Sequence, residues 1–184
     1  MAEIKKKRQA KQKNKPGAGT YDDWVNWQAM YQEARTQGKV VLRGEETVWE
    51  QSRHALLRQY LTPLNEDELA VPGWLVFIQE MRTHSGKHRH QGGICLFVLE
   101  GKGHTIVDGV RYDWEGGDCI FLPVKPGGVE HQHFNDNPDG PSRWMHFGYL
   151  PLHLILGTGT EQIELHPDWK GKVTFKEAKD EAAY

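Results

Sequence analysis

The sequence predicts a mostly β protein, a small antiparallel sandwich or barrel, with helices at its N-terminal end. From Val71 onward, short runs of β-branched and aromatic residues alternate with turns that contain Gly and Pro. The dipeptide Asp108-Gly109 separates two such runs, which is a strong signal for a two-residue hairpin. The 184 residues include 20 Gly and 9 Pro. This composition suits one turn-rich domain with a sizeable core.

Composition divides the chain into four segments. Residues 1–19 carry seven Lys and Arg among Gln, Asn, Ala and Gly, which predicts a basic, disordered tail. We expect residues 20–70 to be a helical segment packed on the barrel and residues 71–156 to be the barrel itself. Residues 157–184 are charged and without periodicity, which predicts an irregular C-terminal extension.

Two helices are predicted before the barrel. Residues 20–23 resemble a capping box, and apolar residues then recur at helical spacing until Gly38, namely Trp24, Trp27, Tyr31 and Ala34. Residues 47–50 are a closer capping box, which predicts a second helix through Tyr60, ended by Thr62-Pro63. We expect the aromatic faces of these helices to dock on the β body or on a second subunit.

The barrel strands follow from β-branched and aromatic runs bounded by turn residues. The predicted strands are residues 74–83, 94–100, 105–107, 110–112, 118–122 and 143–150.

Charge and cysteine content exclude several classes of partner. The net charge of −2 gives no reason to expect nucleic-acid or membrane binding. Two Cys are too few for a disulfide framework and suit a reducing compartment. There is no apolar stretch of membrane-spanning length and no secretory signal. We therefore expect a cytoplasmic protein with a small-molecule partner.

The sequence His88-Arg89-His90 is the strongest functional signal. On a strand, residues at i and i+2 point to the same side, so both imidazoles can bind one ion. A third His from a distant strand would complete one face of a metal and leave the other positions open. His131 and His133 share strand parity, so either could be this third ligand. With ten His in the chain, the pair alone is weak evidence.

The wider pattern resembles the two motifs of the cupin superfamily over residues 74–150. The matching segments are 86–90, 97–101, 107–109, 117–118 and 126–131, with Pro123 and Asn135. The resemblance implies a jelly-roll, or double-stranded β-helix, barrel. It also implies a divalent metal inside the barrel, held by His88, His90 and His131, because the family spacing to Asn135 favours His131.

The sequence departs from the cupin pattern at one position. The first motif usually supplies a Glu four or five residues after its second His, where this chain has Ile94 and Cys95. A neutral three-His site leaves Fe(II) its full charge, which favours anionic substrates that chelate through two oxygens before dioxygen binds. Among cupins, this arrangement resembles gentisate-type, diketone-cleaving and thiol dioxygenases. Residues 88–90 and 97–101 look most similar to the gentisate type.

The sequence therefore favours a mononuclear Fe(II) dioxygenase that cleaves a C–C bond of a small aromatic or enolisable substrate, with dioxygen as co-substrate. Mn, Zn and Ni are alternative metals. The alternative function is a non-oxidative cupin, either a Zn or Mn isomerase or lyase, or a ligand-binding protein without turnover. A structural barrel whose His residues only satisfy one another ranks last.

Three further residues are candidates for catalysis. His133, if it is not a ligand, would be a neighbour of the metal site or a pocket acid or base. Arg82, like Arg143, could provide a cation for a substrate carboxylate, or could be a surface charge. Gln79 is a candidate for orienting substrate or dioxygen.

The remaining expectations concern side chains outside the triad and the oligomeric state. Cys95 resembles the Cys of thiol dioxygenases that is cross-linked to a Tyr, with Tyr149 a conceivable partner, but strand alternation places it on the opposite face. His104 is expected at the surface, and His146 either in the pocket or in the core. The resemblance implies a homodimer formed through sheet edges, which the N-terminal helices could cover.

Overall fold

The computed structural model describes residues 19–157, 159–172 and 174–176. The predicted basic tail therefore lies almost entirely outside the described residues. The elements are α2 (Thr20–Gln37), the 3-10 helix η1 (Gly44–Glu46), β1 (Trp49–Gln51), β2 (Leu56–Leu61), β3 (Trp74–Met81), β4 (His88–His90), β5 (Ile94–Glu100), β6 (Lys102–Val107), β7 (Val110–Glu115), β8 (Cys119–Leu122), β9 (Val129–Asn135), β10 (Ser142–Tyr149), α3 (Leu150–Leu156), β11 (Glu161–Gln162) and β12 (Thr174–Lys176).

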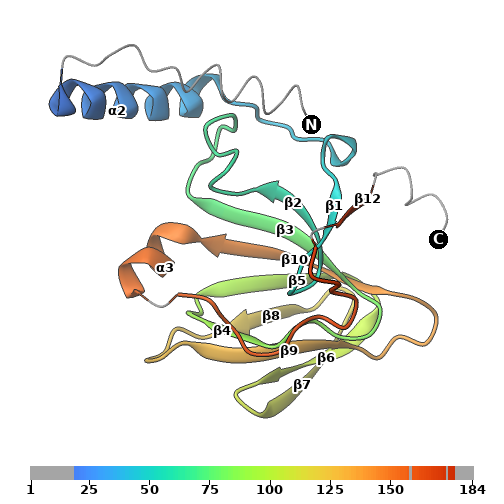
Figure 1. The fold of residues 1–184 in the computed structure, drawn as a ribbon. Helices are drawn as coiled ribbons and strands as arrows, with labels where there is room; N and C mark the ends of the chain where they lie inside the picture. The colour runs from blue at the N-terminus through green and yellow to red at the C-terminus, as the bar shows by residue number, and fades with distance from the viewer. Residues whose placement is uncertain (1–18, 158, 173, 177–184) are drawn as a thin grey trace.

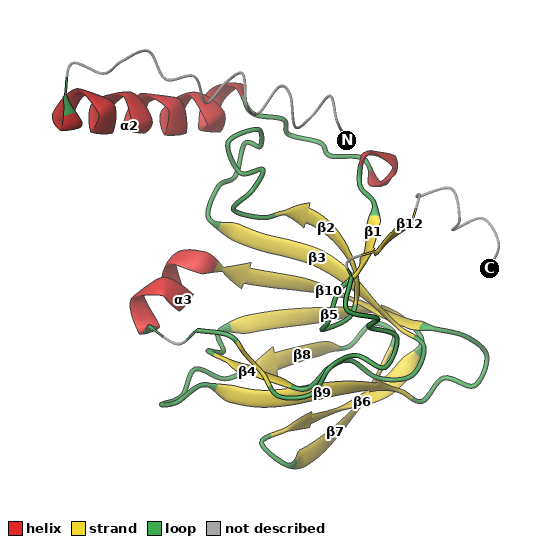
Figure 2. Ribbon diagram, in the orientation of Figure 1, coloured by secondary structure: helices red, strands yellow, loops and turns green. Residues whose placement is uncertain are grey.

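The strands form two antiparallel sheets that face each other (Figures 1 and 2). One sheet has the order β12-β1-β2-β3-β10-β5-β8, and the other has the order β11-β4-β9-β6-β7. Neighbours in space are mostly distant in sequence, as in a jelly roll. The apolar core between the sheets is Met81, Ile94, Leu96, Val98, Trp114, Leu122, Val129 and Trp144. The predicted all-β jelly-roll fold is confirmed.

The predicted hairpin and the strands from Trp74 onward are also confirmed. Val107 pairs with Val110, and the two turn residues have positive φ, 49° at Asp108 and 83° at Gly109. A turn of this kind matches the right-handed twist of the flanking strands. It joins β6 to β7 and so attaches β7 as the edge strand of the five-stranded sheet.

The second predicted helix is wrong, because residues 47–60 lead into and form β1 and β2. The side chains on β2 alternate: Leu57 and Gln59 line an internal cavity, whereas Arg58 points the other way and bonds Thr47. The predicted capping box at Thr47 and Glu50 does not form. The Glu46 carboxylate instead accepts a hydrogen bond from the Arg43 backbone N–H at 2.9 Å, at the start of the short η1. β2 pairs along β3, and these long-range hydrogen bonds override the local helix signal.

The first predicted helix is confirmed as α2, but it does not dock on the barrel. Ala34 is its one buried residue, whereas Trp24 and Trp27 are 52% and 55% exposed. The capping-box start is absent, since Gly19 is the N-cap and no side chain caps the helix. Figure 1 shows α2 projecting beyond the two sheets. The expected packing of residues 20–70 on the barrel is therefore incorrect for this helix.

The C-terminal extension is more regular than expected where it is described. β11 pairs with β4, placing Gln162 opposite His88, and β12 pairs with β1. The segment thus extends both sheets, and β11 supports the strand that carries the His pair. None of the helices in the described ranges is long and apolar enough to cross a membrane.

Candidate metal centre

Three histidines meet on two neighbouring strands of the smaller sheet. β4 carries His88 and His90, and β9 carries His131 directly opposite His88. One potential ligand nitrogen from each lies within 4.8 Å of the others. The strand parity of His88 and His90 and the antiparallel register together produce this cluster. The chain thus has a three-histidine site with the geometry to hold one metal ion.

Backbone carbonyls orient two of the three imidazoles. His90 Nδ1 lies 2.7 Å from the Gln91 carbonyl oxygen, and His131 Nδ1 lies 3.1 Å from that of Val129. Since a carbonyl can only accept, Nδ1 of each ring carries the proton and Nε2 keeps its lone pair. The buried Nδ1 of His88 has no partner among the described residues. An orphaned buried nitrogen in such a cluster fits a site that is completed by a metal.

Burial keeps these imidazoles neutral. It lowers the pKa of His131 to about 3, with the nearby His90 as the next cause. It also holds the pKa of His88 well below the usual value and lowers that of His90. Neutral imidazole is the form that binds metals. The three rings are therefore in the metal-binding state at neutral pH.

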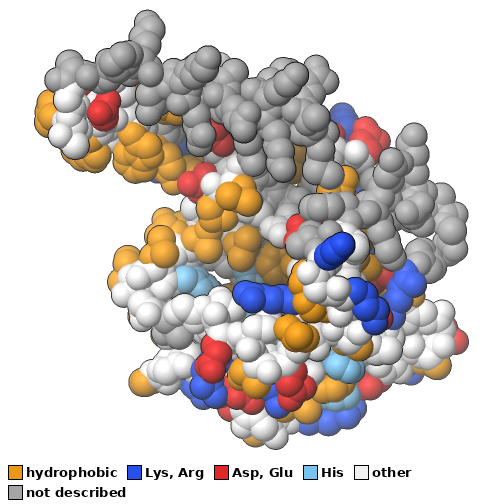
Figure 3. Space-filling view, in the orientation of Figure 1, with side chains coloured by type: hydrophobic (Ala, Val, Ile, Leu, Met, Phe, Trp, Pro, Cys, Tyr) orange, Lys and Arg blue, Asp and Glu red, His pale blue; other side chains and the backbone are white. Residues whose placement is uncertain are grey.

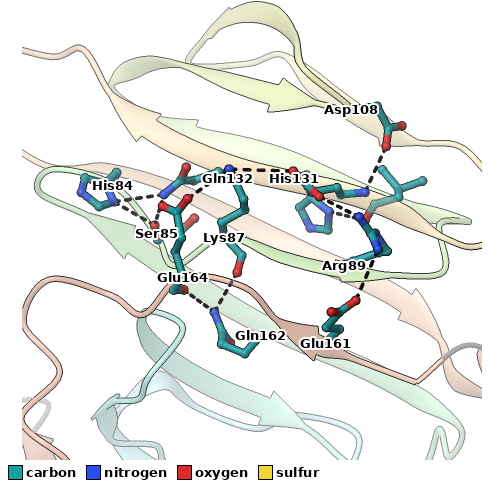
Figure 4. Close-up of polar contacts among 12 residues, drawn as sticks. His84, Ser85, Lys87, Arg89, Asp108, His131, Gln132, Glu161, Gln162 and Glu164 are labelled. Atoms are coloured by element: carbon teal, nitrogen blue, oxygen red, sulfur yellow. Dashed lines mark hydrogen bonds and ion pairs between the residues drawn. The ribbon is translucent and has the colours of Figure 1, made fainter.

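The polar network behind the site ties its strands together (Figure 4). Arg89, between the two ligand histidines, points to the outer face, where it bonds Glu130 at 2.8 Å and Glu161 at 3.4 Å. Lys87 pairs with Glu164 at 3.0 Å on the same side. These bonds join β4 to β9 and to the C-terminal segment. Arg89 therefore supports the register of the site from the outer face and is not part of the histidine cluster.

The cluster opens on a cavity of about 360 Å³ between the sheets. Its apolar wall is Leu57, Leu75, Phe77, Ile94, Leu96, Leu122 and Trp144. Its other lining residues are Ser52, Arg53, His54, Gln59, His133, His146, Thr160 and Gln162, together with the three-histidine site. No Asp or Glu belongs to this described lining. Ile94 occupies the wall while Cys95 is exposed, which confirms that no carboxylate follows the second His into the site.

His54 is a site residue that the sequence analysis missed. It lies in the loop between β1 and β2, with its ring centroid 4.0 Å from that of His88. Burial lowers its pKa to about 3, and its Nδ1 has no partner within the described part of the chain. The residue fell inside the wrongly predicted helix. Only the pairing of β2 with β3 brings it to the metal site.

His133 lines the cavity but lies outside the ligand cluster, so the geometry favours His131 as the third ligand. Its Nδ1 lies 2.8 Å from the Thr105 hydroxyl, which accepts a hydrogen bond from the Trp114 indole at 2.9 Å. Its ring packs against Trp144 with centroids 4.9 Å apart. These contacts hold the ring in one orientation beside the metal site.

Of the other candidates from the sequence, Gln79 is buried near His54, whereas Arg82 and Arg143 are not part of the cavity lining. Gln79 is completely buried on β3 and neighbours His54, and neither atom of its amide has a well-formed hydrogen bond to a described residue. The structure does not place Arg82 beside the metal site, so the expectation that it meets a substrate carboxylate there is wrong. It shares strand parity with Glu80, which it bonds at 3.0 Å, and it is not part of the cavity wall. Arg143 pairs with the same Glu80 at 2.7 Å.

Three more sequence expectations are settled by burial. The expectation that His104 is a surface residue is wrong: it is buried, stacks on Phe134 with centroids 4.6 Å apart, and lies 2.6 Å from Asp136. His146 both lines the cavity and is satisfied by the Leu75 carbonyl at 2.9 Å. Cys95 is exposed and is not part of the cavity lining, as strand alternation predicted.

The fold and the site together define a jelly-roll protein with an internal three-histidine metal-binding site. Residues 74–148 match the family model of the cupin domain, so this part of the chain is a cupin domain. This match spans β3 to β10 and includes all three histidines of the site.

Solved structures of similar fold share little sequence with the chain. A cupin-like protein from Thermotoga maritima is 20% identical with a TM-score of 0.48, covering 73% of this chain and 99% of that chain. A predicted oxalate decarboxylase from the same organism is 19% identical with a TM-score of 0.49, covering 60% and 99%.

A salicylate 1,2-dioxygenase from Pseudoaminobacter salicylatoxidans, in a structure with gentisate, is 21% identical with a TM-score of 0.48. That match covers 81% of this chain but 38% of the dioxygenase. No curated protein matches the chain. At these identities none of the structural similarities bears on activity.

Proposed function

We propose that this protein is a mononuclear non-haem Fe(II) dioxygenase that cleaves a C–C bond of a small aromatic or enolisable substrate. The observation that carries the proposal is a three-histidine site, without a carboxylate, on the wall of a cavity between the sheets. Bound Fe(II) would supply redox chemistry with dioxygen at coordination positions that the protein leaves open. Three neutral nitrogens leave the charge of the metal to be met by an anionic, chelating substrate.

The cavity wall suits a substrate about the size of one aromatic ring. A volume near 360 Å³ is at the small end of ligand pockets. Phe77 and Trp144 lie on one side, with ring centroids 5.9 Å apart in a tilted arrangement. Apolar walls of this kind hold the body of a ligand and exclude water from its reacting atoms.

His133 is the residue best placed to move a proton at the substrate. The Thr105 hydroxyl accepts from Trp114 and has a proton left to donate to His133 Nδ1. In that arrangement Nε2 of His133 bears the proton and can donate it to a substrate oxygen. Burial holds the pKa of His133 well below its usual value, so the ring binds as a neutral donor.

The charge of an anionic substrate would be met by the metal and, at the cavity edge, by Arg53. Arg53 is the cationic residue within the described cavity lining, and its side chain is exposed. His54, whose ring contacts that of His88, and its buried neighbour Gln79 supply polar groups beside the metal site. We assign them to the orientation of substrate or dioxygen. A reducing cytoplasm would suit both a ferrous site and the two free cysteines.

The test is anaerobic loading of the purified protein with Fe(II), followed by addition of catechols, gentisates and β-diketones. A substrate should perturb the absorption spectrum before air is admitted, and oxygen uptake should follow. The matched control is His131→Ala, which removes one ligand, with its fold checked by circular dichroism. No spectral change and no oxygen uptake with any of these compounds would overturn the proposal.

A non-oxidative cupin is the second candidate, since three neutral nitrogens with an open position also suit Zn as a Lewis acid. Such a protein would be an isomerase, a lyase or a ligand-binding protein. Metal analysis of protein purified without added metal separates the two candidates. Stoichiometric Zn or Mn, without oxygen consumption after reloading with Fe(II), would favour the second.

A further inference from the structure

The outer surface of the larger sheet is apolar where β10, β5 and β8 lie side by side. On β5, Ile94, Leu96 and Val98 are buried in the core, and the alternate residues are exposed. We define the outer face by seven exposed uncharged side chains from these three strands: Cys95, Phe97, Leu99, Cys119, Phe121, Phe147 and Tyr149. The exposed Glu100 lies at the end of β5, where it pairs with Arg143 at 3.1 Å. Phe121 is 69% exposed. A solvated sheet face is normally polar, so an apolar one indicates an interaction site.

The helix α2 presents a second apolar surface. Two ring pairs run along it: Tyr21 with Trp24, at 6.2 Å between centroids, and Trp27 with Tyr31, at 5.3 Å. Met30 between them is 56% exposed. Figure 3 shows this row of hydrophobic side chains along the helix, with an open space between it and the rest of the molecule. An isolated helix of this length, about 27 Å, is marginally stable in water without packing.

The base of α2 is fixed, so the helix cannot fold back onto its own sheet without breaking contacts. Lys39, just after the helix, exchanges two backbone hydrogen bonds with the segment around Leu69, at 2.9 and 3.1 Å. Gly38 is packed so tightly there that an added Cβ would lie 2.5 Å from the Leu69 backbone. Tyr31, at the base of the row, already lies near Glu66 and Tyr149 of its own chain. The part of the row from Tyr21 to Met30 therefore needs a partner from outside its own chain.

A second copy of this chain would cover both apolar surfaces, and their combined area is large enough for a stable dimer. If each large side chain carries about 200 Å² of surface, the exposed parts of the two regions amount to roughly 1,000 Å² per chain. A stable dimer buries about 800 Å² per partner. In a two-fold arrangement, each copy offers one helix and receives one, so both apolar surfaces are covered at once.

From these observations we propose that the chain forms a two-fold dimer in which α2 of each copy packs on the outer face of the other. The proposal is independent of the reaction catalysed. The metal site opens on the inside of the barrel, whereas the outer face lies on the opposite side of the larger sheet.

The first test is the molar mass of the full chain in solution, by light scattering and sedimentation over a micromolar concentration series. The wild-type chain should be a dimer. Phe121→Glu on the outer face and Trp27→Glu on α2 should each raise the dissociation constant at least tenfold, because a charge would be buried without a partner. Leu165→Glu, also at an exposed apolar position, is the control and should stay dimeric.

The second test uses the two native cysteines, which both belong to the outer face. A chain carrying Cys95→Ser, Cys119→Ser and Met30→Cys has its single thiol on α2. Mixed with tagged wild-type chain and a short bismaleimide, it should give a cross-linked pair of one chain of each kind. A monomeric wild-type chain would overturn the proposal. So would a dimer that resists both charge substitutions and gives no such cross-link.

Discussion

His88 on β4 stands directly opposite His131 on β9, with ring centroids 4.2 Å apart. Because successive side chains of a strand point to opposite faces, a slip of one residue in this pairing would turn one ring out of the barrel. The metal site thus depends on the register of two strands that are separated by the whole β5 to β8 segment.

Removing one ligand should abolish tight metal binding without unfolding the barrel. We expect His131→Ala to lose most of its bound metal and the rise in melting temperature that added metal gives to the wild-type chain. His84→Ala is a suitable control, because His84 lies outside the cluster. Elemental analysis and thermal melts check this. Unchanged metal content in His131→Ala would rule out the three-histidine site.

His133 should affect turnover and not metal content. We expect His133→Phe to lower kcat by roughly 100-fold or more, the usual contribution of a positioned acid or base. Metal stoichiometry should stay near that of the wild-type protein. Thr105→Val should have a smaller effect in the same direction, because the His133 ring stays in place but loses the hydroxyl that orients it. It also leaves the Trp114 indole without its acceptor, so some loss of stability is expected as well. If His133→Phe instead loses the metal, then His133 is a ligand.

A carboxylate can be introduced at the cavity wall on β5, at the position where cupins usually have one. Ile94→Glu would place a carboxylate at the cavity wall and reduce the net charge of the metal site. We expect metal to be retained while an anionic chelator such as a catechol binds at least tenfold more weakly. Val110→Glu on β7 is the control, since this position is exposed and lies outside both the cavity and the outer face. Equal effects of the two substitutions in spectral titrations would argue against a charge effect at the metal.

The buried histidines should make the metal-free protein less stable in mild acid. Burial lowers the pKa of His146 to about 4, whereas an unfolded His titrates near 6.5. Below about pH 6.5, His146 binds a proton in the unfolded chain but not in the folded chain. The free energy of unfolding therefore falls as the pH decreases toward 4. Each such group contributes up to about 1.4 kcal/mol per pH unit.

Urea denaturation of wild type and His146→Phe at several pH values between 7 and 5 measures this effect. The variant lacks one of the titrating groups, so its stability should depend less steeply on pH. It also loses the bond to the Leu75 carbonyl, which lowers its stability equally at every pH. Parallel curves for the two proteins would contradict the assignment.

Much of the barrel could be predicted from the sequence because its signals are local. The strands from Trp74 onward, the hairpin at Asp108-Gly109 and the parity of His88 and His90 follow from period-two alternation and turn chemistry. The cupin resemblance then led to His131 as the third member of the cluster, which the strand register confirms. The absence of a carboxylate after the His pair is also visible in the sequence, because Ile94 and Cys95 occupy the positions where cupins usually have a Glu.

The features that were missed depend on contacts between distant segments. The capping-box signal at Thr47 predicted a helix, but β3 pairs with residues 56–61 as a strand, and this pairing carries His54 to the metal site. Arg82 could not be assigned to a face until the register of β3 against β10 placed its neighbour Glu80 opposite Arg143. The aromatic spacing in α2 likewise indicated a buried face without indicating what covers it.

The sequence by itself determined the strands from Trp74 onward, the His88–His90 pair and the absence of a carboxylate beside it, because these depend on residue type and on spacing within single strands. Only the tertiary structure decided which side chains surround the metal site and which apolar surfaces remain uncovered. The physical reason is that sheet pairing forms between residues far apart in the chain. Its hydrogen bonds and burial outweigh the local propensities that a sequence displays.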